Sequence, residues 1–168
     1  TKPDDFSLGL VLYYKSMYLR KSSYYFGSVL LVYTFVLSLG YMLQRTFILH
    51  PKKLNKSYVY DFDFQFQEIN FQTEDGIVNA IHAKTEGDSK GVVLYFHGNA
   101  DNLKRWGRVS SDFLDRNYDV IMLDYRGFGK SDGKATEENM YEDALSMYNY
   151  ALKHYDSDEI LIYGRSIG

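Results

Sequence analysis

A serine between two glycines lies at the end of the sequence, in surroundings typical of an enzyme nucleophile. The pentapeptide 164–168 has the spacing G-x-S-x-G and directly follows the apolar run 160–163. In this motif a sharp strand-to-helix turn exposes the serine hydroxyl, and the glycines let the backbone turn without a Cβ clash. The pattern predicts that Ser166 is the nucleophile of an acyl-transfer reaction. The alternative is a serine in an ordinary glycine-bounded turn.

Ser166 needs a base, because a hydroxyl is a weak nucleophile until its proton is removed. In the usual chain order of this motif the acid and the histidine follow the serine, so we expect both partners beyond residue 168. His97 could replace them, but it follows an apolar run in a glycine turn, which favours a structural role. We therefore expect residues 1–168 alone to be inactive. We also expect them to be unstable, because the strand that enters the serine turn would expose a long apolar edge.

The segment His97-Gly98-Asn99-Ala100 could supply the second part of this chemistry. It follows the apolar run 91–96 and precedes a helical pattern. Backbone N–H groups here could face a developing oxyanion together with the N–H of Ile167, and one such donor lowers the barrier by about 3 kcal/mol. The alternative is a helix entry capped by Asn99 or Asp101, and both interpretations can hold at once.

The segment 124–133 resembles a nucleotide-binding loop but lacks residues that such a loop requires. Gly129-Lys130-Ser131 matches the end of a phosphate-binding loop, but the motif needs glycine at the position of Asp124. The dinucleotide motif fails too, because Asp132 stands where glycine or alanine is required. We interpret the segment as an ordered loop after a buried strand. The other histidines have no metal-ligand spacing, so we expect neither a metal nor another cofactor.

Hydrophobic periodicity predicts the elements that must position these residues. Alternating patterns predict an antiparallel hairpin, and continuous apolar runs predict strands buried on both faces. The expected strands are 67–73, 77–83, 91–96, 120–123 and 160–163, and the expected helices carry residues 103–114 and 140–155, the second capped by Thr136. Strands that alternate with helices and short links predict an α/β fold, with a mostly parallel sheet and helices on both faces.

An uncharged stretch at 22–44 precedes these elements. Its apolar core of about 20 residues would just cross the hydrocarbon layer of a membrane as a helix. We predict a single transmembrane anchor; a buried core helix and a cleaved signal peptide are the alternatives. The resulting division is an N-terminal segment 1–21, an anchor 22–44, a juxtamembrane linker 45–60 and, at 61–168, the truncated N-terminal portion of the catalytic domain. Translation is expected to begin at Met17, and the side of the membrane that holds the domain stays open.

Composition excludes several classes of protein. The 168 residues carry a formal net charge of -3 and lack a Lys/Arg-rich run, so we expect no nucleic-acid partner. The sequence has no cysteine, which excludes disulfides, CxxC redox sites and thiolate zinc sites.

The segments YFHGNADN, LDYRGFGKSDG and IYGRSIG, in this order around a helix, resemble the α/β-hydrolase superfamily. More narrowly, they are similar to its membrane-anchored serine hydrolases of the abhydrolase-domain type, a group that includes protein depalmitoylases. The resemblance covers about residues 60–168 and implies Ser166 as nucleophile, with the backbone amides of Asn99 and Ile167 as oxyanion hole.

The resemblance also implies a reaction and a substrate class. We expect a membrane-anchored enzyme that cleaves an ester, thioester or related acyl bond through an acyl-serine intermediate. Its substrate would be a small acyl compound, a lipid or an acylated protein, and peptides stay open. The alternative is a non-catalytic, membrane-anchored interaction protein that retains the hydrolase scaffold.

Overall fold

The computed structural model describes residues 5–168, without the side chains of 5–7 and 45–47, and divides the chain into two units, Thr1–Phe47 and Ile48–Gly168. Helix α1 (Asp5–Ile48) is continuous over 44 residues. Its segment Leu8–Gln44 is long and apolar enough to cross a membrane, a property that signal sequences and core helices share. The helix extends the predicted anchor in both directions. Of the predicted N-terminal segment, residues 1–4 lie outside the described residues.

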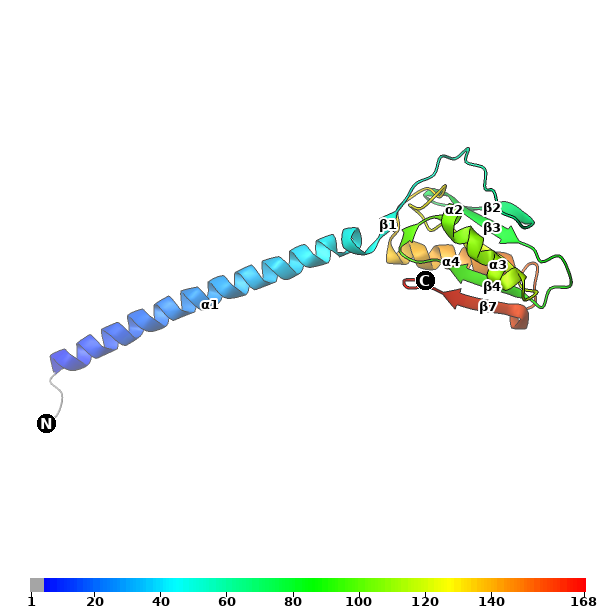
Figure 1. The fold of residues 1–168 in the computed structure, drawn as a ribbon. Coiled ribbons are helices and arrows are strands. Elements are labelled where there is room, and N and C mark those ends of the chain that lie inside the picture. Colours follow the sequence, from blue (N-terminus) through cyan, green and yellow to red (C-terminus); the bar gives the residue numbers. More distant parts are fainter. Residues whose placement is uncertain (1–4) are drawn as a thin grey trace. The chain divides into compact units, whose positions relative to one another are not determined.

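A five-stranded sheet in the order β2-β3-β6-β4-β7 forms the frame of residues 48–168 (Figure 1). Its strands are β2 (Phe66–Thr73), β3 (Gly76–Ala83), β4 (Val92–Phe96), β6 (Asp119–Leu123) and β7 (Ile160–Gly164). β2 and β3 form the predicted antiparallel hairpin, and β3 is antiparallel to β6. β4 lies parallel to both β6 and β7. The predicted α/β fold is therefore confirmed.

Helices cover both faces of this sheet (Figure 1). On one face α4 (Glu137–Ala151) packs through Met147 against alternate residues of β4 and β6. On the other face α2 (Leu103–Trp106) and α3 (Ser110–Leu114) cover the intervening residues of the same strands. Both faces of β4 and β6 are thus buried, which explains why these strands are apolar throughout. Thr136 caps α4 as predicted, because its side chain accepts a hydrogen bond from the N–H of Asn139.

The helix expected over residues 103–114 is interrupted. A 3-10 turn, η1 (Gly107–Val109), separates α2 from α3. A Cβ atom at Gly107 would overlap the ring of Phe62, so this glycine permits a close approach of that ring to the backbone. The cap also differs from expectation: Asn102, rather than Asn99 or Asp101, accepts a hydrogen bond from the N–H of Lys104 at 3.1 Å.

β7 corrects another expectation, since its apolar sequence predicts a strand buried on both faces. It lies at the edge of the sheet, paired with β4 alone among the described strands. Leu161, Ile162 and Tyr163 are 46%, 70% and 48% exposed. Burial of β4 and β6 depends on helices that cover both faces. The described helices cover β7 only in part: the ring centroid of Phe113 in α3 lies 5.5 Å from that of Tyr163.

A buried polar cluster lies at the end of the sheet where β4 and β6 begin. His82 of β3 is 2% exposed, and its Nδ1 and Nε2 atoms lie 3.0 and 2.8 Å from the hydroxyls of Tyr150 and Tyr155. The Tyr155 hydroxyl donates to Asp119, which also pairs with Lys84 at 3.0 Å. Burial, and next the charge of Lys84, lower the pKa of His82 to about 4.

His82 is expected to make the domain less stable as the pH falls from about 6.5, the pKa of an unfolded histidine, to about 4, its folded pKa. In this window the unfolded state binds more protons, so stability is complete above the window and is lost on acidification. The loss should not exceed about 3 kcal/mol. Urea unfolding of the full-length protein at pH 7 and pH 4.5 measures it.

His82→Gln should reduce this acid-induced loss of stability, because a glutamine side chain does not titrate. His154→Gln is the matched control, since His154 lies beside the same cluster but is exposed. Equal losses in both variants would contradict the assignment to His82.

Candidate active site

The carboxyl ends of the parallel strands bring the predicted site residues to one edge of the sheet. β4 leads into the turn His97-Gly98-Asn99, β6 leads into the loop 124–133, and β7 leads into Ser166. The register aligns Phe96 with Gly164, and the N–H of Arg165 donates to the carbonyl of Phe96 at 3.0 Å. The turns after β4 and β7 are therefore joined directly.

Ser166 lies in a strained and exposed turn. Its φ of 62° falls in the left-handed region, which costs a non-glycine residue about 1 to 2 kcal/mol. The N–H of Gly168 closes the turn by donating to the carbonyl of Arg165 at 3.1 Å. A Cβ at Gly164 would overlap the carbonyl of Gly168, and a Cβ at Gly168 would overlap that of Phe96. The glycines of the motif are thus required by the close backbone contacts of the turn.

Gly98, in the turn after β4, lies beside Ser166. A Cβ atom at Gly98 would lie 3.7 Å from the Cβ of Ser166 and 3.5 Å from the ring of Trp106. Asn99 follows Gly98 in this turn, and Ile167 follows Ser166. The two residues whose backbone amides we predicted as oxyanion donors therefore lie in two turns that adjoin each other.

Gly98→Val in the full-length protein is expected to slow fluorophosphonate labelling about 10²-fold, the effect of a displacement of about 1 Å in a reacting group. The branched methyls would have to occupy the space of Ser166 or Trp106. Gly98→Ala is the matched comparison, since a single methyl makes only ordinary contacts there. Labelling rates within threefold of each other for the two variants would contradict this packing.

His97 lies in the interior and is fully buried. Its Nδ1 atom lies 2.8 Å from the Gly98 carbonyl, and its Nε2 atom lies 3.5 Å from Oδ1 of Asp124. Its ring stacks on Trp106, with the centroids 6.1 Å apart. This environment holds the turn in place and leaves no approach for a substrate, so His97 has a structural role.

Asp124 organises the loop beneath the site. Its Oδ1 atom accepts a hydrogen bond from the N–H of Leu103 at 2.9 Å, and burial raises its pKa. The hydroxyl of Ser131 donates to the carbonyl of Asp124 and accepts from the N–H of Asn79. Gly129 has a φ of 41° and lies against the Asp124 carboxyl group. The loop 124–133, which resembles a phosphate-binding loop in sequence, is thus held in place by internal hydrogen bonds.

Two arginines that the sequence did not single out lie against Trp106. The guanidinium groups of Arg105 and Arg165 each lie 5.1 Å from the ring of Trp106. The indole N–H of Trp106 donates to the carbonyl of Ala100 at 2.7 Å. Trp106 therefore links the turn after β4 to the residue before Ser166. An arginine directly before the nucleophile was the only sequence signal for this arrangement.

Comparison with known proteins agrees with this geometry. The model of a family described as serine aminopeptidase, S33, matches residues 87–168. Protein bem46 of Schizosaccharomyces pombe is 28% identical over 114 residues, which cover 64% of this chain and 38% of that protein. An uncharacterised protein of Acanthamoeba polyphaga mimivirus, R595, is 32% identical over 102 residues, which cover 58% of this chain and 34% of that protein. The chain thus spans little more than a third of these two relatives.

Solved structures show the same fold. An alpha-beta hydrolase from Vibrio vulnificus has a TM-score of 0.52 at 26% identity, covering 58% of this chain and 34% of that one. The Pyrococcus furiosus esterase Pf2001 has a TM-score of 0.55 at 23% identity, covering 71% of this chain and 49% of that one. These likenesses show that the chain has the α/β-hydrolase fold. Over residues 87–168 the chain is similar to the S33 family, and the likenesses together support an α/β hydrolase of the abhydrolase type.

Proposed function

We propose that the full-length protein is a membrane-anchored serine hydrolase, which cleaves an ester, thioester or related acyl bond through an acyl-Ser166 intermediate. One observation carries the proposal: Ser166 is held exposed, in a left-handed turn, against the glycine of the turn after β4. Strain of this kind persists only where the surrounding structure enforces it, and it is concentrated at functional sites. An ordinary turn at this position would need neither the strain nor the contact.

The chemistry follows from the positions of the two turns. The Oγ atom of Ser166 attacks the acyl carbonyl carbon while a base takes its proton, and the carbonyl oxygen becomes an oxyanion. The amides of Asn99 and Ile167 donate to that oxyanion, and each such bond is worth about 3 kcal/mol. The leaving group departs with a proton, and water then releases the acyl group from Ser166. The base is expected to follow the serine in chain order, since His97 is buried.

The proposed substrate is a small acyl compound, a lipid or an acylated protein. A catalytic domain carried by a membrane helix meets substrates that are themselves held at the bilayer. The apolar segment Leu8–Gln44 supports such an anchor. Sedimentation of the full-length protein with membranes after carbonate washing, and its release when residues 8–44 are deleted, tests this part of the proposal.

The experiment that tests the reaction is to locate a fluorophosphonate adduct. The full-length protein in detergent micelles is labelled and digested with a protease that cleaves after glutamate, giving a peptide that begins at Ile160. The adduct is expected on Ser166, and the buried Ser110 and Ser131 serve as internal references. A folded protein that takes no label, or takes it on another serine, would favour the alternative of a non-catalytic scaffold.

A further inference from the structure

The last residue of α1 and the residues that follow it bind the proposed oxyanion loop. We name residues 48–54 the strap. Within it β1 (His50–Pro51) pairs in parallel with β5 (Ala100–Asp101), which continues the turn after β4. We predicted this part of the chain as a linker, and the structure instead includes it in the same unit as the sheet.

Asn99 is bound by the strap from two sides. The N–H of His50 donates to the carbonyl of Asn99 at 2.8 Å. The Nδ2 atom of Asn99 donates in return to the carbonyl of Ile48 at 2.7 Å. These contacts use the carbonyl and the side chain of Asn99 and leave its own N–H for the oxyanion. Two residues later Asp101 has a φ of 72°, a strained conformation held between the strap and α2.

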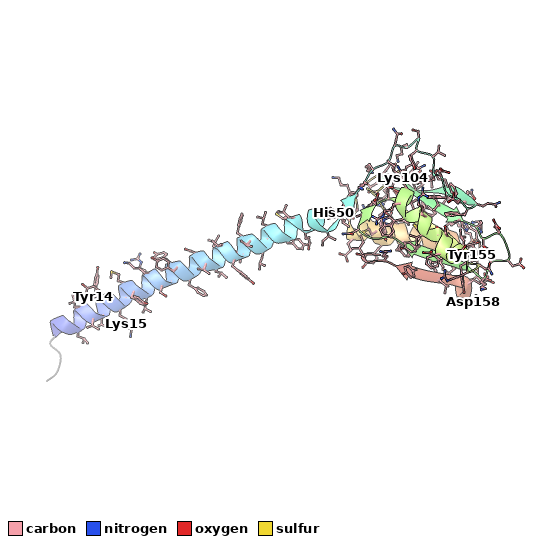
Figure 2. All side chains as sticks on the ribbon, in the orientation of Figure 1. Tyr14, Lys15, His50, Lys104, Tyr155 and Asp158 are labelled. Atoms are coloured by element: carbon pink, nitrogen blue, oxygen red, sulfur yellow. The ribbon has the colours of Figure 1, made fainter. Side chains whose placement is uncertain are left out.

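The strap also joins the oxyanion turn to the loop after β6. The carbonyl of Lys52 accepts from Nδ2 of Asn102 at 3.0 Å and from the N–H of Gly129 at 2.9 Å. The N–H of Leu54 returns a bond to the carbonyl of Gly129 at 2.9 Å. Asn102 is buried and caps α2, so the strap is bonded both to the start of α2 and to the loop after β6. Figure 2 shows His50 and Lys104 at one end of this unit and Tyr155 and Asp158 at the other.

We propose that the strap positions the oxyanion donor: the bonds of His50 and Ile48 to Asn99 fix the direction of the Asn99 N–H. This inference rests on the proposed function. A donor contributes to the rate only when it is aimed at the place where charge develops, and its loss reduces kcat about 10² to 10³-fold. The residues after the membrane helix therefore take part in positioning for catalysis.

His50→Pro tests the strap, because proline removes the N–H that binds Asn99. We expect kcat per labelled active site to fall about tenfold, as for a partly misaligned donor, with KM within twofold of wild type. A trifluoromethyl ketone, which forms a tetrahedral oxyanion on the serine, should bind more weakly by the same factor. His50→Ala keeps the N–H and removes only an exposed side chain, so it is the matched comparison.

A second variant and a second measurement guard against a simple folding defect. Asn99→Ala removes the bond to Ile48 but keeps the backbone amide. Like His50→Pro, it should lower kcat without changing KM. Hydrogen–deuterium exchange of the peptide covering residues 97–102 should be faster in His50→Pro than in His50→Ala, whether or not the protein is active.

The outcomes separate the strap from the proposed function. Wild-type protein that resists fluorophosphonate would overturn both proposals. Normal wild-type labelling, with equal kcat, ketone affinity and exchange in His50→Pro and His50→Ala, would overturn the strap alone. A lower fraction of labelled sites in His50→Pro, with unchanged kcat per labelled site, would show that the strap only stabilises the fold. That result would also overturn the strap proposal.

Discussion

Replacing Ser166 with alanine in the full-length protein is expected to reduce kcat about 10⁶-fold, the scale of nucleophile deletions in another serine hydrolase. The variant keeps the oxyanion amides but cannot form the acyl intermediate. Hydrolysis of a p-nitrophenyl ester measures the loss, and fluorophosphonate labelling should disappear with it. Because Ser166 is exposed and the alanine retains its Cβ, the turn should still form.

Ser111→Ala is the control for this substitution, since Ser111 is exposed on α3 and outside the site. It should keep wild-type hydrolysis and labelling. Activity of Ser166→Ala within tenfold of wild type would contradict the assignment of the nucleophile, and would require a different serine or a different chemistry.

Asp143→Ala is expected to destabilise the domain by about 3 to 5 kcal/mol, the usual cost of removing one partner of a buried ion pair. Asp143 of α4 is fully buried and accepts from Nε of Arg126 at 2.8 Å and from the backbone N–H of the same residue at 3.0 Å. The Arg126 side chain is itself 5% exposed. Without Asp143 this guanidinium keeps only peripheral partners. Urea unfolding of the full-length protein gives the change in free energy.

Glu142→Ala supplies a matched comparison on the same guanidinium. Glu142 pairs with Arg126 at 2.6 Å but is 61% exposed, and exposed pairs contribute up to about 1 kcal/mol. If both variants lost the same stability, burial of Asp143 would not be what makes the pair important. The comparison also tests the loop after β6, because Arg126 fixes that loop to α4.

Local pattern was sufficient to predict much of the sheet. The hairpin of β2 and β3 has alternating residues around a tight turn, and its strands pair antiparallel in the structure as predicted. β4 and β6 are continuously apolar because helices cover both of their faces. The cap at Thr136 is equally local, since it involves the residue and the next turn of helix.

Long-range contacts were not predictable in this way. The strap pairs with residues that lie about 50 positions further along the chain, and two-residue strands have no periodicity to detect. The exposure of β7 depends on its neighbours in the sheet, which its own apolar sequence cannot specify. The need for glycine at position 107 depends on the ring of Phe62, a contact between residues far apart in the chain. The positions of Ser166, Asn99 and Ile167 could be proposed from motifs, but the bonds that hold Asn99 could not.

The left-handed backbone of Ser166 has a consequence for selection and engineering. Glycine adopts this conformation without the penalty of about 1 to 2 kcal/mol that serine pays, so Ser166→Gly should melt at a higher temperature than wild type. That variant would have no hydroxyl. A screen of this protein for heat resistance alone would therefore enrich variants that lack the nucleophile. Each round of such a screen has to be paired with an assay for turnover.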